Sequence, residues 1–154
     1  MFLNISEKHP ILYYRICTIF LERNGQEGHG EDVMEDNRKE QAEALEVLQE
    51  FNDRLIKNIG ILIKELSGSR LDDTDKFIKG ITDAMNWEIQ VMNGTMELLN
   101  EGKQRIDKEA FNQAITGVGE AINEKDDAKM AAAFSEVLPY FIGLGEAAAE
   151  VLGK

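Results

Sequence analysis

From Met34 to the end of the chain, apolar residues recur in steps of three and four. That spacing places them on one face of an α-helix, and the alternation typical of strands is absent after residue 34. The sequence therefore predicts an all-α fold. Four amphipathic helices are expected, at residues 35–66, 73–100, 108–123 and 127–152. Because the connections between them are short, we expect a four-helix up-down bundle.

Two polar residues, Asn52 and Glu88, fall on otherwise apolar helix faces. A polar residue in such a position commonly fixes helix register or oligomeric state. A buried carboxylate can instead have a raised pKa and act in a site. The register interpretation is favoured, because no other catalytic group accompanies either residue.

Met92 belongs to a methionine stripe on the second predicted helix, and Trp87 lies beside that stripe. Methionine stripes usually fill cores, although flexible methionine surfaces also accept partner helices. The core interpretation is favoured for Met92. Trp87 fits either the core or an anchor in an interface, with a slight preference for the core.

Glycine is frequent inside the predicted helices, where each glycine costs about 1 kcal/mol relative to alanine. The favoured explanation is close helix approach, above all where Gly117 and Gly119 could face Gly143 and Gly145. A hinge or a groove at the third and fourth helices is the alternative. The glycines concerned are Gly60, Gly80, Gly94, Gly117, Gly119, Gly143 and Gly145.

Pro139 falls in the middle of the fourth predicted helix. Proline removes a backbone donor and clashes with the preceding turn, so we expect this helix to be kinked or split near Leu138. A kinked helix leaves space beside it. A small-molecule pocket near Pro139, Tyr140 and Glu88 is therefore a second hypothesis.

Several residues predict where the helices begin and end. Asp107 and Asp126 are candidate N-caps, and Gly68 is a candidate left-handed cap after the first helix. The acidic residues at 72, 73 and 75 favour a helix start. The same acidic run could attract a cation, but its spacing does not match a calcium-binding loop, so capping is favoured.

Residues 1–33 differ from the rest and are treated as an N-terminal extension to a bundle domain at 34–154. They hold both histidines, the single cysteine and a glycine-rich stretch. Their apolar run, residues 11–21, is shorter than the roughly 20 residues that span a membrane. One interpretation is a short helix or strand packed on the domain. The other is that natural translation starts at Met34, which an intact N-terminus at Met1 in the native protein would contradict.

Charge and residue content exclude several classes of function. The chain has 29 acidic and 17 basic residues, a net charge of −12, which disfavours nucleic-acid backbones and anionic membranes. Residues 34–154 contain no histidine and no cysteine, so histidine-dependent nucleophilic sites and Cys/His zinc sites are excluded there. No phosphate-binding glycine loop is present. We expect no catalytic residues, no cofactor and no metal.

Residues 121–126, 131–134 and 136–139, about a fifth of the chain, carry a distinctive pattern in the last two predicted helices. In this pattern the chain resembles small acidic helical proteins of Gram-positive bacteria. The pattern has two parts. The first is a turn that begins with alanine and ends in aspartate, here Asp126, and the second is a later helix that contains Glu-Leu-x-Pro. Val137 stands where that pattern has leucine directly after glutamate. The resemblance implies a helical fold and carries no activity.

Together these patterns predict a non-enzymatic, cytoplasmic protein-interaction module, such as an adaptor or a small acidic chaperone. Its partner would be another protein or a second copy, with self-association through Trp87 or residues 11–21. The alternative is a helical bundle that binds a small ligand. An enzyme would need acid–base chemistry from Glu88 and Tyr140 alone.

Overall fold

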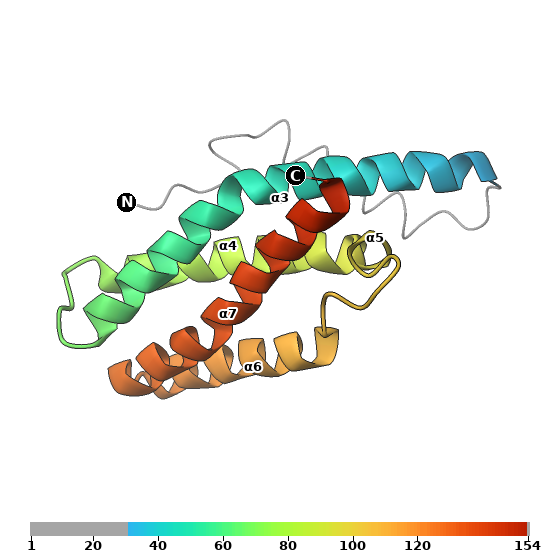
Figure 1. The fold of residues 1–154 in the computed structure, drawn as a ribbon. Coiled ribbons are helices and arrows are strands. Elements are labelled where there is room, and N and C mark those ends of the chain that lie inside the picture. Colours follow the sequence, from blue (N-terminus) through green and yellow to red (C-terminus); the bar gives the residue numbers. More distant parts are fainter. Residues whose placement is uncertain (1–30, 154) are drawn as a thin grey trace.

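The computed structural model describes residues 31–153, with side chains from residue 38 onward. No strand occurs in this part of the chain, so the predicted all-α fold is confirmed there. The predicted boundary at Met34 falls inside the first helix, and residues 1–30 of the predicted extension lie outside the described residues. The helices are α3 (Glu31–Leu66), α4 (Thr74–Gly94), α5 (Met96–Leu99), α6 (Lys108–Glu124) and α7 (Asp127–Leu152) (Figure 1).

Two of the predicted helix caps are confirmed. The Asp107 carboxylate accepts a hydrogen bond from the Ala110 amide, and the Asp126 carboxylate accepts one from the Lys129 amide, each at 3.1 Å. These bonds satisfy donors that a helix start leaves without intrahelical partners. After α3, Gly68 has a φ of 121°, a backbone conformation that glycine adopts readily.

The start of α4 differs from the prediction, because Asp73 occupies the N-cap position without a side-chain cap bond. The buried Thr74 hydroxyl organises this corner instead. It accepts a hydrogen bond from the Leu71 amide at 2.8 Å and donates one to Glu65 Oε1 at 2.7 Å. The turn is therefore closed by a threonine, whose hydroxyl both donates and accepts.

The second predicted helix was expected to be continuous to residue 100, and this is wrong. It breaks at Thr95, which separates α4 from the single turn of α5. The buried Thr95 hydroxyl donates to the Val91 carbonyl at 2.7 Å, and the Thr95 amide bonds to the Met92 carbonyl at 3.2 Å. A hydroxyl that bonds back into the preceding turn, after the weak helix former Gly94, favours termination.

The fourth predicted helix is not split. α7 continues from Asp127 to Leu152 with Pro139 inside it, so the expected interruption near Leu138 is wrong. The expected kink stays a prediction.

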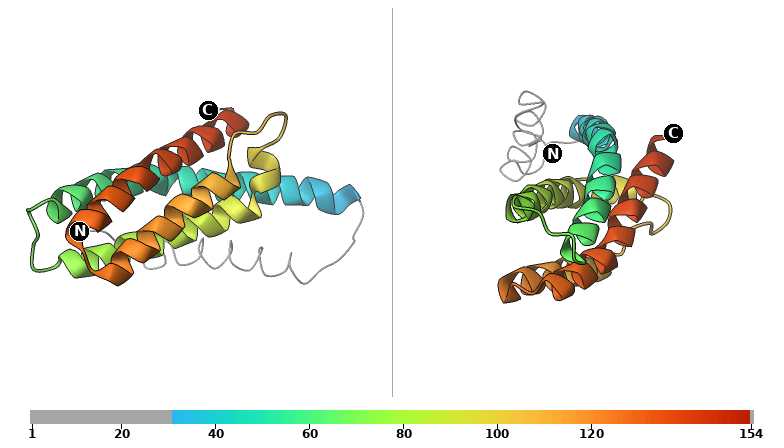
Figure 2. Two further views of the ribbon diagram at one scale, coloured as in Figure 1. Left: turned by 90° about the horizontal axis from the view of Figure 1, so that it is seen from below. Right: turned by 90° about the vertical axis from the view of Figure 1, so that its left-hand side faces the viewer.

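The core lies between the central pair α3 and α7, with α4 packed on α3 and α6 packed on α7. Figure 1 shows that successive long helices run in opposite directions and that the first part of α3 extends beyond the other helices. In the right-hand, end-on view of Figure 2, α6 lies at the bottom of the molecule, and the first turns of α3 lie at the top. The largest fully buried side chains include Phe111, Phe134 and Phe141.

The expected pairing of helical glycines is wrong. A Cβ atom placed on Gly117, Gly119 or Gly143 would meet nothing within 4 Å, and the same holds for Gly60. Only Gly145, among the helical glycines whose surroundings the structure describes, has a close neighbour, and that neighbour is the side chain of Asn52. Close approach therefore occurs between a glycine and a polar side chain.

Candidate functional site

The structure brings together Asn52 and Glu88, two of the six residues that the sequence singled out. Asn52 is on α3 and is 3% exposed, and Glu88 is on α4 and is fully buried. Asn52 Nδ2 donates a hydrogen bond to Glu88 Oε1 at 2.8 Å and a second to the Phe141 carbonyl of α7 at 3.1 Å. One amide group therefore connects three helices.

Gly145 completes this arrangement from α7. A Cβ atom on Gly145 would overlap Asn52 Oδ1, so the absence of a side chain there makes room for the amide. We call Asn52, Glu88, the Phe141 carbonyl and Gly145 the core polar cluster. The sequence signal for Gly145 was the cost of glycine inside a helix, but it did not indicate which residue the glycine accommodates.

Burial sets the protonation state of Glu88. Removal of the carboxyl from water raises its pKa to about 8, and the hydrogen bond from Asn52 lowers it by a smaller amount. Glu88 is therefore mainly protonated and neutral at pH 7. Its Oε2 atom has no hydrogen-bond partner within the described part of the chain. A neutral carboxyl is much less costly to bury than an ionised one.

Trp87 and Met92 lie in the core. Trp87 is 5% exposed, and its ring meets Phe51 edge to face, with ring centroids 6.1 Å apart. Its Nε1 donor has no partner among residues 38–153. Met92 is fully buried. Neither side chain offers an exposed surface to a partner in this structure.

Pro139 and Tyr140 are not brought to Glu88. Pro139 is exposed on α7, whereas the ring of Tyr140 packs on Phe111 of α6 at a centroid distance of 5.6 Å. Glu88 instead bonds to Asn52 of α3. A shallow surface depression does occur among the described residues, but it lies along α6 between Lys108 and Glu120.

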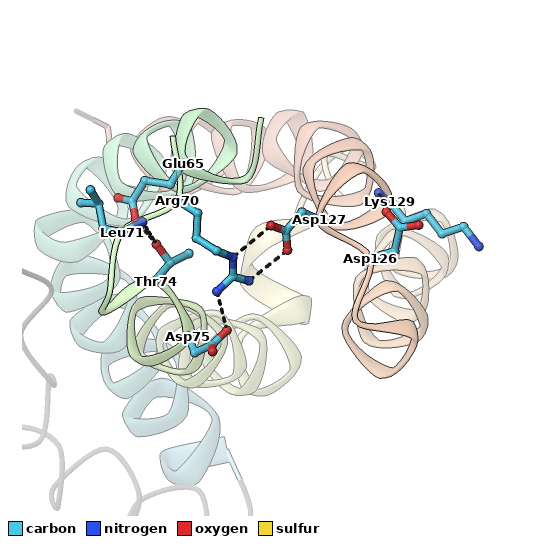
Figure 3. A network of polar contacts seen from close by, with 8 residues as sticks. All are labelled: Glu65, Arg70, Leu71, Thr74, Asp75, Asp126, Asp127 and Lys129. Atoms are coloured by element: carbon cyan, nitrogen blue, oxygen red, sulfur yellow. Dashed lines mark hydrogen bonds and ion pairs between the residues drawn. The ribbon is translucent and has the colours of Figure 1, made fainter. Parts of the chain in front are cut away.

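A second polar network joins helices at the surface, and sequence reasoning missed it. Arg70, in the loop after α3, donates two hydrogen bonds to the Asp127 carboxylate, from Nε at 3.0 Å and from Nη2 at 2.9 Å. Its Nη1 bonds to Asp75 at 2.9 Å (Figure 3). We call Arg70, Asp75 and Asp127 the surface ion network. The guanidinium of Arg70 lowers the pKa of Asp127 below its usual value.

The described residues contain neither a metal-binding cluster nor a membrane-spanning helix. No group of three or more His, Cys, Asp or Glu side chains there is placed to hold a metal ion. None of the described helices combines the length and the apolar character that a membrane span requires.

The core polar cluster falls inside a region that matches a family model. Residues 43–147 match the model of a domain of unknown function, DUF8042. The chain belongs to this family. The DUF8042 region contains Asn52, Glu88, Phe141 and Gly145, and also Arg70 and Asp127 of the surface ion network. No curated protein and no solved structure matches the chain.

Proposed function

We propose that the chain is a non-enzymatic protein-interaction module, an acidic adaptor or chaperone-like domain of the cytoplasm. Its partner is another protein or a second copy, in preference to nucleic acid or a membrane. The proposal takes the four long helices as one up-down bundle with a bend in α7 at Pro139. The small-ligand alternative has less support, because Tyr140 and Glu88 contact different helices.

The observation that carries the proposal is the exposed position of α6. This helix packs mainly against α7, and the residues along its depression, from Lys108 to Glu120, are almost all exposed and polar. Polar, exposed faces are typical of the rims of non-obligate interfaces. α6 therefore offers a broad surface that the fold itself does not use.

The charge of this region indicates the kind of partner. Residues 107–153 contain nine acidic and three basic side chains, half of the net charge of the whole chain. Such a field accelerates encounters with a basic surface and disfavours acidic ones. We therefore propose a partner protein with a basic docking surface.

The experiment is an affinity capture from lysate of the source organism, with the folded chain as bait and mass spectrometry as readout. The test variant reverses two exposed charges on α6, Glu109→Lys with Glu120→Lys. The matched control makes the same charge change on the exposed side of α7, Glu136→Lys with Glu146→Lys. Trp87→Ala is unsuitable, because truncating a buried tryptophan lowers stability by roughly 3–5 kcal/mol.

We expect the α6 variant to lose a captured protein at least about tenfold, equivalent to roughly 1.4 kcal/mol of binding free energy, while the α7 variant retains it. Equal retention by both variants would contradict a role of α6. Equal loss would show that net charge, and no particular surface, drives capture. A folded bait that captures nothing would favour the ligand alternative, and a saturating ligand at about 100 times its Kd would then add about 2.7 kcal/mol of stability.

A further inference from the structure

Glu88 is the only ionisable side chain that is buried in the described part of the chain. The groups that face it from the neighbouring helices carry no charge. α3 presents the amide of Asn52, and α7 reaches the cluster through the Phe141 carbonyl and Gly145. No charged group therefore compensates an ionised Glu88 in this core.

The hydrogen bonds of the cluster leave one oxygen of Glu88, Oε2, without a partner among the described residues in either protonation state. Asn52 offers two N–H donors through Nδ2, and one goes to Glu88 Oε1 while the other goes to the Phe141 carbonyl. A protonated Glu88 leaves a neutral group unpaired at Oε2, whereas an ionised Glu88 leaves a charged oxygen there without any donor. An uncompensated carboxylate in an apolar interior is costly, and water entry is the direct way to solvate it.

The amide of Asn52 cannot easily turn to supply that donor. Its Oδ1 lies against the backbone of Gly145, and its Nδ2 is already bonded to two helices. Any movement of Asn52 toward Glu88 Oε2 would weaken the bond to the Phe141 carbonyl. The cluster therefore leaves only a neutral group unpaired when Glu88 is protonated, and an uncompensated charge when Glu88 ionises.

We infer that the core polar cluster is a proton-dependent connection among α3, α4 and α7, which is closed while Glu88 is protonated and loosens when Glu88 ionises. This inference does not depend on the proposed protein-interaction function. It makes the packing of α4 and α7 on α3 sensitive to pH.

Trp87 reports on this connection without any label. It precedes Glu88 on α4, it is buried, and it is the only tryptophan in the chain. Loosening of α4 from α3 would admit water near its ring and shift its fluorescence emission. The readout therefore uses the full, unmodified protein.

The first experiment follows Trp87 emission from about pH 5 to about pH 10 in the wild type and in Glu88→Gln. Glutamine keeps a side-chain oxygen that can accept from Asn52 and cannot ionise. We expect a red shift in the wild type with a midpoint near pH 8, and a constant emission in Glu88→Gln. The matched control is Glu136→Gln, which removes an exposed carboxyl of α7 and keeps the wild-type transition.

The second experiment measures urea unfolding of the same proteins across this pH range. The pKa of Glu88 is about 8 in the folded chain, whereas a glutamate in the unfolded chain has the ordinary value of 4.5. Between these two pH values the folded state therefore binds one more proton than the unfolded state. Stability therefore falls as pH rises through this window. We expect the unfolding constant of the wild type, relative to that of Glu88→Gln, to rise about tenfold per pH unit and to level off above about pH 8.

Two results would overturn the inference. One is a wild-type emission that stays constant through about pH 8, a result that does not depend on whether Glu88→Gln folds. The other is an emission or unfolding profile of Glu88→Gln that follows the wild type at every pH. Loss of the transition in Glu136→Gln would also contradict it, because the transition would then belong to surface charge.

Discussion

The core polar cluster and the surface ion network both join helices that are far apart in the sequence, and they differ in exposure. In the core, Asn52 and Glu88 are almost inaccessible to solvent, and Asn52 makes two hydrogen bonds between helices, one of them to Glu88. At the surface, Arg70 makes three hydrogen bonds to two carboxylates, with side chains that are 37% exposed or more. The surface network has the larger number of bonds and the larger charges.

The comparison teaches that burial decides how much each contact matters. Water competes for exposed ion pairs, and holding long side chains in one geometry costs entropy, so such pairs contribute little. In the core, removing one partner leaves the other without a hydrogen bond and without solvent. We therefore expect stability to depend on the core cluster far more than on the Arg70 network.

The largest effect is expected for Asn52→Ala. This change removes both donors of the core cluster. It leaves Glu88 Oε1 without a hydrogen bond and leaves a small cavity where the amide was. We expect a loss of about 3 kcal/mol in the free energy of unfolding, measured by urea denaturation. Asn86→Ala on the exposed side of α4 is the control and should change stability by no more than about 0.5 kcal/mol. Equal effects of the two substitutions would remove the distinction between core and surface.

The next effect separates two glycines of the same helix. Gly145→Ala places a Cβ against Asn52 Oδ1 and should cost about 2 kcal/mol, although alanine is the better helix former. Gly143→Ala meets nothing within 4 Å and should add about 0.5–1 kcal/mol. Thermal and urea denaturation measure both changes.

A double-mutant cycle sharpens this prediction. In the Asn52→Ala background the steric conflict is gone, so Gly145→Ala should no longer destabilise the fold. The coupling between the two positions is the expected signature of direct contact. Additive effects of the two substitutions would show that Gly145 matters for another reason.

The surface ion network should show the smallest effect. Arg70→Gln is expected to lower the thermal midpoint less than any change in the core cluster. Whatever effect it has should shrink at high salt, because exposed charges are screened over a few ångströms at about 1 M ionic strength. The Asn52→Ala loss should be nearly independent of salt. A salt-insensitive and large Arg70→Gln effect would reverse the comparison.

The two regions should also respond to pH in opposite directions. Arg70 lowers the pKa of Asp127, so this contribution is present above the ordinary pKa of 3.8 and is lost as pH falls further. The raised pKa of Glu88 makes its contribution disappear as pH rises instead. In a pH series of urea unfolding curves, Asp127→Asn should remove only the loss of stability that the wild type shows at acidic pH. An unchanged acid-side profile would show that the exposed pair contributes nothing.

Local patterns predicted the helical class and the position of most helices. Apolar spacing placed α6 and α7 within a residue of their observed ends, and the capping aspartates Asp107 and Asp126 were correctly assigned. These features depend on residues a few positions apart, which periodicity and capping rules describe. The break at Thr95 was missed because a threonine hydroxyl can serve a helix interior or end it, and only the buried geometry decides between them.

The candidate site was predicted only in part. Asn52 and Glu88 were identified as polar residues on apolar faces, but their contact spans 36 positions and depends on how α3 and α4 pack. Gly145 was noticed for its helix cost, while its partner was expected to be another glycine. The pairing of Arg70 with Asp127 spans 57 positions and likewise has no local signal. Long-range contacts of this kind follow from tertiary packing.

The central claim is that Glu88 is a neutral carboxyl in the core, bonded to Asn52. The most direct measurement is a ¹³C NMR titration of the glutamate side-chain carboxyls, with the Glu88 signal assigned by its absence in Glu88→Gln. The structure predicts a midpoint near pH 8 for this one signal. A midpoint near the ordinary value of 4.5 would show a solvated carboxylate and would contradict both the burial of Glu88 and the core polar cluster built on it.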